Sequence, residues 1–126
     1  MPEITPAAIA APAANYAHAV LTESPSRWLH TSGVVPIAPD GSTPEALGDQ
    51  ATVVWTNIAA MLRDAEMTPS DIVSITTYVV VGEELGPVMT ARDTALGGHR
   101  AASTLVTVPA LARSEWRMEV AVIAAR

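Results

Sequence analysis

The sequence predicts an α+β fold in which two helices cover one face of a sheet, in the order β-β-α-β-α-β-β. Three observations support this prediction. Residues 72–81 are dense in β-branched side chains, residues 47–65 repeat apolar side chains at helical spacing, and residues 101–124 form two apolar segments joined by a turn. With 126 residues and no internal repeat, the chain is expected to be a single domain spanning 1–126.

The first third of the chain predicts two short strands after an N-terminal arm. Residues 1–14 are rich in Ala and Pro and lack periodicity, so we expect a loosely ordered arm. Residues 16–21 and 28–32 suit strands, with a turn at 23–26 between them. The stretch 33–41 ends in Pro-Asp-Gly and is predicted to be a loop.

The clearest helix signal follows this loop. Ser42-Thr-Pro-Glu45 has the spacing of a capping box, with Pro in the first turn. One apolar face is then predicted from side chains at three- and four-residue spacing: Leu47, Ala51, Val54, Ile58, Met61, Leu62 and Ala65. Thr68-Pro-Ser-Asp71 ends the pattern.

The second half predicts a central strand, a weaker helix and two closing strands. Residues 72–81 form the long strand, and the helix runs from 82–84 to about Leu96, where Gly97 and Gly98 end it. The last strand carries one carboxylate, Glu119, among apolar residues. Desolvating a carboxylate costs several kcal/mol, so Glu119 is expected to have a partner or a function.

The charge balance argues against several partners. The net charge of −6 lacks the basic stripe that nucleic acid requires, so no nucleic-acid binding is expected. No apolar run reaches membrane-spanning length, and the N-terminus lacks the pattern of a signal peptide. We therefore expect no membrane partner and a cytoplasmic location.

The absence of two residue types limits the chemistry further. The chain has no Cys, which excludes thiolate catalysis, and no Lys, which excludes a Schiff base and the usual pyridoxal phosphate enzymes. The three histidines are scattered, so neither a metal site nor a cofactor is expected. His18 and His30 are candidate acids or bases near neutral pH, although histidines in such positions are more often half-buried strand residues.

Several segments, taken in order, resemble the RidA (YjgF) family of reactive-intermediate deaminases. Asn15 to Val20 is similar to the family's Pro-Tyr-Ser-Gln-Ala-Val opening, and Thr31 to Pro36 to its Thr-Ser-Gly-Gln-Ile-Pro signature. Asp71 to Tyr78 is similar to its Asp-Val-Val-Lys-Val-Thr-Val-Tyr strand. The closing strands, from Ser103-Thr104 to Met118-Glu119-Val-Ala-Val-Ile-Ala124, are similar to its C-terminus. The resemblance covers residues 14 to 125.

This resemblance implies a chorismate-mutase-like fold with a mixed sheet, assembled as a homotrimer with clefts between subunits. It also implies hydrolysis of small imines or enamines to carbonyl compounds and ammonia. Glu119 would then orient or deprotonate the water. The backbone N–H near Thr104, with the hydroxyls of Ser32 and Tyr16, would donate hydrogen bonds.

The chain departs from the family where the substrate carboxylate would bind. The family's Arg, which clamps that carboxylate, is replaced by Ala102. Three arginines are candidate substitutes. Arg100 and Arg117 each share a strand face with a predicted site residue, and Arg113 lies in the turn between the closing strands. Met89 stands near the family's Asn and aromatic positions, and we place it with Ala102 among the substrate-binding residues.

Three functions remain open at this point. The chain is a Rid-type hydrolase, a ligand-binding trimer without turnover, or a diverged catalyst such as a tautomerase, a cyclase or another hydrolase. For Glu119 the structural alternative is a salt bridge to Arg117 or to an Arg of another strand.

Overall fold

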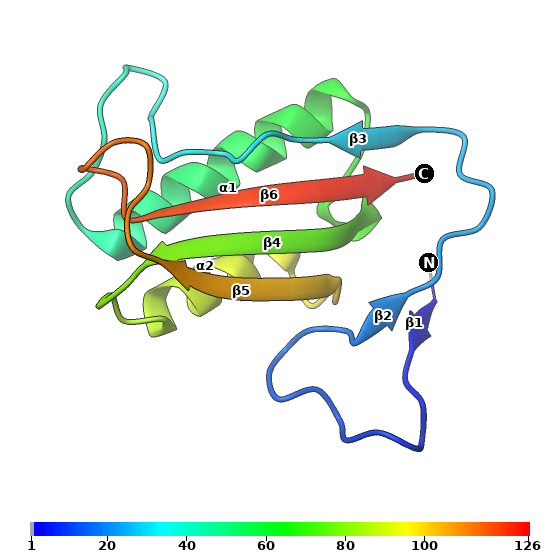
Figure 1. Cartoon of the computed structure of the whole chain (residues 1–126). Coiled ribbons are helices and arrows are strands. Elements are labelled where there is room, and N and C mark those ends of the chain that lie inside the picture. Colours follow the sequence, from blue (N-terminus) through cyan, green and yellow to red (C-terminus); the bar gives the residue numbers. More distant parts are fainter. Residues whose placement is uncertain (1) are drawn as a thin grey trace.

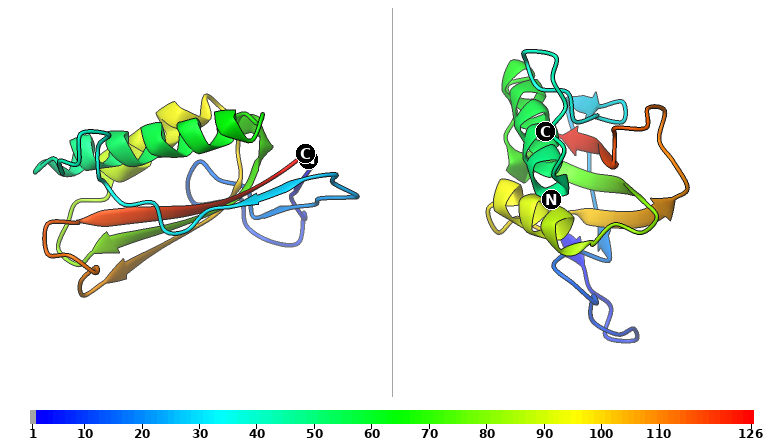
Figure 2. Two further views of the ribbon diagram at one scale, coloured as in Figure 1. Left: turned by 90° about the horizontal axis from the view of Figure 1, so that it is seen from above. Right: turned by 90° about the vertical axis from the view of Figure 1, so that its left-hand side faces the viewer.

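The computed structural model describes residues 2–126 and confirms the α+β fold with both helices on one face of a mixed sheet. Figure 2 shows the two layers edge-on, with the sheet on one side and the helices on the other. The elements are β1 (Glu3–Ile4), β2 (Ala19–Val20), β3 (Trp28–His30), α1 (Leu47–Asp64), the 3₁₀ turn η1 (Pro69–Asp71), β4 (Ile72–Val80), α2 (Gly86–Leu96), β5 (Ala102–Val108) and β6 (Met118–Ala125).

The main sheet has the strand order β3-β6-β4-β5 (Figure 1). Strands β4 and β5 are parallel, whereas β6 runs antiparallel to both β4 and β3. The last strand in sequence is therefore an inner strand, and Glu119 on β6 lies opposite Tyr78 on β4. Glu119 therefore lies on an inner strand but near one end of the sheet, because it is the second residue of β6.

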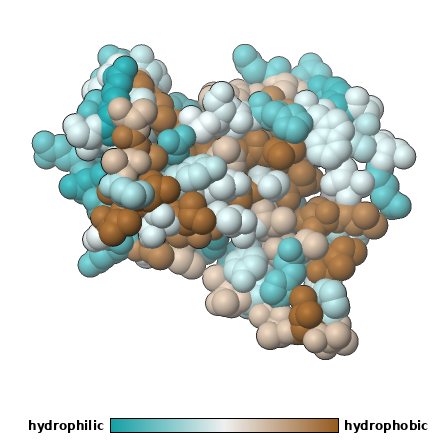
Figure 3. All heavy atoms as spheres, in the orientation of Figure 1, coloured by the Kyte–Doolittle hydropathy of each residue, from teal (hydrophilic) through white to brown (hydrophobic). Residues whose placement is uncertain are grey.

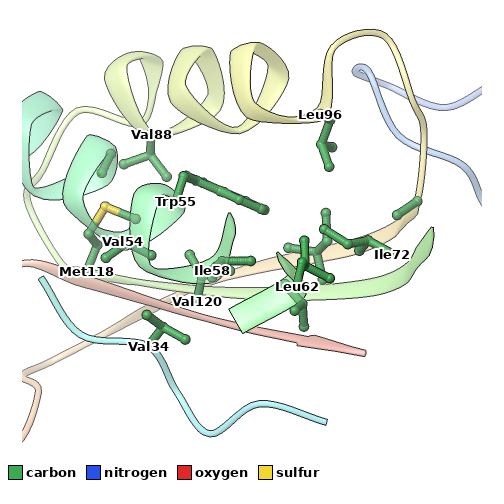
Figure 4. Close-up of a cluster of buried hydrophobic side chains, with 14 of the residues drawn as sticks. Val34, Val54, Trp55, Ile58, Leu62, Ile72, Val88, Leu96, Met118 and Val120 are labelled. Carbon is green, nitrogen blue, oxygen red and sulfur yellow. The ribbon is translucent and has the colours of Figure 1, made fainter. Parts of the chain in front are cut away.

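The core lies between the sheet and the helices. Alternate residues of β6 point toward the helices and are fully buried: Met118, Val120, Val122 and Ala124. The residues between them are only half-buried and point to the opposite side. Figure 4 shows α1 contributing Val54, Ile58 and Leu62 to this core, with Trp55 between α1 and α2.

The N-terminal segment differs from the prediction of a strand over residues 16–21. Only Ala19–Val20 is a strand, and it pairs with Glu3–Ile4 in a separate two-stranded sheet. Ala17 forms a single parallel bridge with Ala102 at the start of β5. A segment this rich in Ala has few side chains that favour a continuous strand, so it follows the edge of the main sheet for only one residue.

The predicted start of the first helix is wrong. The helix begins at Leu47, and Ala46 precedes it without a side-chain cap. Ser42 is engaged elsewhere, because its backbone N–H and its hydroxyl both donate to Asp40 Oδ1, at 3.0 and 2.6 Å. The serine therefore stabilises the turn before the helix instead of the helix end. Met61, predicted for the apolar face, is 41% exposed.

The second helix begins later than predicted but ends where the glycines indicate. It starts at Gly86, beyond the acidic pair at 83–84, and Gly97 caps it in the left-handed conformation at φ 57°. Glycine adopts this conformation without the steric cost that other residues incur, which is why it terminates helices so often.

Gln50 joins the helix layer to two loops. Its side chain is completely buried, and its Nε2 donates to the carbonyls of Pro44 and Glu115, both at 2.8 Å. Its Oε1 accepts from the backbone N–H of Arg117 at 2.9 Å. These three bonds hold the backbone directly before β6, so Gln50 helps to position Glu119, which lies two residues after Arg117.

We predict that Gln50→Leu lowers the free energy of unfolding by about 3 kcal/mol, because it leaves two carbonyls and one N–H without their partner. Urea unfolding at a fixed protein concentration measures the loss. Thr56→Ala, an exposed change on the same helix, is the control and should stay within about 0.5 kcal/mol of the wild type. A loss for Gln50→Leu no larger than that of the control would contradict the prediction.

Candidate functional site

The face of the main sheet that the helices leave uncovered carries three of the predicted site residues. We call it the open face. Glu119 lies on β6, and Ala102 and Thr104 lie on β5, in register with Ser74 and Thr76 of β4. Figure 3 views the molecule from this side, and most of the surface over the strands is apolar or weakly polar. Among the residues of β3, β4, β5 and β6, Glu119 is the one carboxylate on this face.

The Glu119 carboxylate rests directly against Gly33. A Cβ atom at position 33 would lie 1.7 Å from Glu119 Oε2 and 2.9 Å from its Cδ, so only glycine leaves room for the carboxylate in this place. Gly33 follows β3 and precedes Val34, which forms a bridge with Val120 of β6. The backbone at Gly33 therefore borders the space that the Glu119 carboxylate occupies.

Glu119 has no salt bridge with any residue in 2–126. The alternative of an ion pair with Arg117 is not formed, because the Arg117 Nε lies 3.3 Å from Glu83 Oε1 in the loop after β4. Across the strand pair, the neighbour of Glu119 is Tyr78, a half-buried residue on the same face. The carboxylate is thus held in place by packing and remains available for a ligand or a water.

Ser32 is exposed and directly precedes Gly33, the residue against which the Glu119 carboxylate lies. It lines a groove of about 390 Å³ along the β3 edge, together with His30, Gly33 and, from α1, Asn57 and Met61. Glu119 does not line this groove. Ser32 and Glu119 therefore do not share this groove in one chain.

Tyr16 and Arg100 meet at the opposite corner of the open face, beside Ala102. The Arg100 Nη2 donates to the Tyr16 carbonyl at 2.5 Å and lies 3.0 Å from Glu3 Oε1. The Arg100 Nε is buried and has no partner among residues 2–126. The Tyr16 hydroxyl accepts from the backbone N–H of Ala13 at 3.3 Å. Arg100 therefore binds a carboxylate in this structure, and that carboxylate belongs to the arm of the same chain.

The other predicted residues are more widely spread. Ala102 is two strands from Glu119, about 10 Å across the sheet, and the register displaces it by about 13 Å along the strands. Met89 lies on α2 and therefore in the other layer. His18 Nε2 bonds to the Ala10 carbonyl at 2.6 Å in the arm. One chain does not bring all predicted site residues into one pocket.

Two residues of this region were not singled out from the sequence as site residues. Gly33 was predicted only as the start of a loop, although the Ser-Gly pair next to a strand was a signal for close backbone approach. Tyr78 was predicted only as part of the central strand, and no local signal places it beside Glu119. That neighbour relation depends on the register of β4 with β6.

Within residues 2–126, no group of three His, Asp or Glu side chains converges in a way that would hold a metal ion. Neither α-helix in that range combines the length and the apolar character that a bilayer-spanning segment requires.

A family model described as endoribonuclease L-PSP matches residues 6–126. The chain is a member of the YjgF/Rid family. This finding confirms the resemblance seen in the sequence. No curated protein matches the chain at a significant level.

Solved structures of family members share the fold over the full chain. A Rid-family protein of unknown function from Yersinia pestis, YyfB, is 28% identical with a TM-score of 0.85, covering 99% of this chain and 98% of its own. The YjgF protein of E. coli is 24% identical with a TM-score of 0.73 over 100% and 99%. E. coli TdcF with bound serine is 21% identical with a TM-score of 0.74 over 100% and 99%. At these two lower identities the likeness shows the fold alone.

We predict that Gly33→Ala displaces the Glu119 carboxylate while the protein stays folded. The added methyl takes the place of Oε2, but a glutamate side chain can rotate away at a cost of about 1 kcal/mol. A crystal structure of the variant should show Glu119 in a different rotamer, and urea unfolding should show a small change. An unmoved carboxylate would contradict the prediction. So would a large loss of stability that persists in the Gly33→Ala, Glu119→Ala double variant.

Proposed function

We propose that this protein is a Rid-type hydrolase that acts on a small imine, enamine or related carbonyl compound in clefts between the subunits of a homotrimer. The observation that carries the proposal is the Glu119 carboxylate on the open face, held against Gly33 and without a cation among residues 2–126. A carboxylate that no cation neutralises is a suitable base for activating water.

The reaction requires few groups. A water attacks the carbon of the protonated imine while Glu119 accepts one of its protons, which gives a neutral carbinolamine. Glu119 then returns this proton to the nitrogen. The C–N bond breaks as the hydroxyl oxygen forms the C=O bond and loses its proton to solvent, and the products are a carbonyl compound and ammonia. An enamine first takes up a proton at carbon to form the imine. The backbone N–H near Thr104 and the Ser32 hydroxyl supply hydrogen bonds to the substrate. No cofactor enters these steps.

Assembly as a trimer is supported by what one chain leaves exposed. Trp28 and Val106 on the open face are 51% and 40% exposed, and β5 is an edge strand of the sheet. Apolar surface and unpaired strand edges of this kind favour coverage by another chain. In addition, Glu119 and Arg100 lie at diagonally opposite corners of the open face. A small ligand can therefore contact both only if the two residues come from different subunits.

The family's description as an endoribonuclease suggests RNA as a competing substrate. The charge distribution favours a small molecule instead. The net charge is −6, and four of the seven cationic side chains are paired within the chain, those of Arg92, Arg100, Arg117 and Arg126. Binding RNA requires several cations directed at phosphates, and this surface offers few.

We predict that the wild type suppresses the trapping of 2-imino acids by semicarbazide when an amino-acid oxidase generates them in situ. Glu119→Gln should reduce this hydrolysis by about a hundredfold, because it removes the base but keeps the side-chain volume. Gly33→Ala should show a comparable loss, since it displaces the same carboxylate. The assay should cover small, aliphatic and aromatic amino acids.

Glu84→Gln is the matched control, because it removes an exposed carboxylate from the loop between β4 and α2. It should retain wild-type activity. Gel filtration checks the assembly at the same time, with elution expected at three times the chain mass. Equal activity of the Glu119→Gln variant and the wild type would overturn the role of Glu119. A stable monomer would overturn the intersubunit cleft.

The second candidate is a ligand-binding trimer without turnover, and the Arg100 corner favours it. Ala102 provides no clamp, and the guanidinium of Arg100 is paired with Glu3 of the same chain. A diverged catalyst, such as a tautomerase or a cyclase, would also be compatible with the absence of a free clamp if its substrate were a neutral compound. Absence of hydrolysis with every imine, combined with measurable ligand binding, would favour these alternatives.

We predict that Glu3→Gln strengthens the binding of small carboxylates if Arg100 serves as the substitute clamp, since it removes the carboxylate that competes for the guanidinium. A fivefold lower Kd, about 1 kcal/mol, is expected in calorimetric titrations with pyruvate. Arg100→Gln should abolish the gain in the double variant. An unchanged Kd in Glu3→Gln would show that Arg100 serves only to hold the arm.

A further inference from the structure

A cavity lies between the two helices, in the layer away from the open face. This interhelical groove has a volume of about 790 Å³, within the range of small-molecule sites. Each helix contributes one stripe of mostly small side chains, spaced three or four residues apart. These small side chains include Gly48, Thr52 and Ala59 of α1, and Ala91, Thr94 and Ala95 of α2.

The floor of the interhelical groove contains an unpartnered donor. Trp55 is only 6% exposed and lies between α1 and α2 (Figure 4). Its indole Nε1 is buried and has no hydrogen-bond acceptor among residues 2–126. A buried N–H of this kind is normally bonded, so a small tilt of the indole that brings Nε1 to the groove surface would let an acceptor in the groove satisfy it.

The lining of the groove includes one charged side chain, the guanidinium of Arg63. Arg63 is exposed in the last turn of α1, and its guanidinium has neither an ion pair nor a hydrogen bond with residues 2–126. Four other arginines of the chain do form such ion pairs. The groove therefore combines apolar walls with an indole N–H that lacks an acceptor and a guanidinium that lacks an anion.

We propose that the interhelical groove binds a small aromatic carboxylic acid that carries a carbonyl oxygen in its apolar part. The carboxylate pairs with Arg63, the rings pack between the helices, and the carbonyl accepts from the Trp55 indole. Arg63 can reach toward Trp55, because side chains on a helix lean toward its N-terminus. The sheet separates this groove from Glu119, so the site is independent of the proposed hydrolysis and stays accessible when the open face is covered.

The probe is 4-benzoylbenzoate, which has a carboxylate, two rings and a ketone between them. In ¹⁵N-edited NMR spectra the three tryptophans give three indole signals, and Trp55→Phe assigns one of them to Trp55. Titration of the wild type should shift the Trp55 signal downfield in its proton dimension and leave the Trp28 and Trp116 signals in place. Trp116 is an internal control, since its Nε1 is also buried without a partner but lies outside the groove.

Two matched probes separate the interactions. The amide 4-benzoylbenzamide lacks the charge, and 4-benzylbenzoate lacks the carbonyl; each should bind about fivefold more weakly to the wild type. Arg63→Gln should weaken only the two carboxylates, and Trp55→Phe should abolish the advantage of the ketone. Arg113→Gln, which removes an exposed guanidinium outside the groove, should bind all three like the wild type.

Three results would overturn the proposal. One is a titration that leaves the Trp55 indole unshifted, and another is equal binding of the acid by the wild type and Arg63→Gln. The third is a shift confined to Trp28, which would place the ligand on the open face. Arg63→Gln changes only an exposed side chain, so the test stands even if Trp55→Phe fails to fold.

Discussion

The strict alternation of β6 is the constraint on which the rest of this structure depends. Because successive side chains of a strand point to opposite faces, burying Met118, Val120 and Val122 under the helices forces Glu119 onto the open face. A shift of one residue would bury the carboxylate in an apolar core and expose the valines. The register is therefore fixed by the hydrophobic effect, and the position of the candidate base follows from it. Gln50 supports the same register by bonding the backbone where β6 begins.

The cations of this chain are used mainly to attach segments to one another. Arg27 donates to the carbonyls of Ala65 and Glu66 after the end of α1, at 2.6 and 3.2 Å. Arg100 attaches the arm through Glu3, and Arg117 attaches the loop after β4 through Glu83. Such partly exposed pairs contribute little stability individually, so their main effect is to orient the segments. An arginine in such a role becomes a clamp for a ligand only by exchanging its partner. Because Ala102 carries no guanidinium, a ligand carboxylate that binds at Arg100 has to displace Glu3 from it.

The sequence predicted those features that depend on periodicity. The central strand, both helices and the last strand were found because one face of each is buried and the repeat is visible along the chain. The start of α1 was missed because Ser42 has two competing uses, as a cap and as a partner of Asp40, and the chain gives no means of choosing between them. The pairing of Glu3–Ile4 with Ala19–Val20 was missed because two-residue strands have no periodicity to detect.

The candidate site was less predictable, since it depends on register and on empty space. Glu119 was identifiable as a lone carboxylate in an apolar strand, but its contact with Gly33 arises between segments far apart in sequence. The distance between the Glu119 and Arg100 corners likewise follows from the pairing of both β5 and β6 with β4. A sequence pattern states that residues occur together in a family. It does not state whether they meet within one chain or across two.

The two layers of the molecule consequently have different chemical properties. The open face has exposed apolar residues, an unpaired strand edge and one carboxylate, which suits contact with another copy and chemistry at the contact. The helix layer has its own groove, a buried donor and an unpaired cation. Glycine and other small residues line much of this groove, and Trp55 belongs both to its lining and to the buried core. A ligand there would contact the helices that cover the core beneath β6. It would therefore act on the proposed site only through the packing of α1 and α2 against the sheet, without touching the substrate.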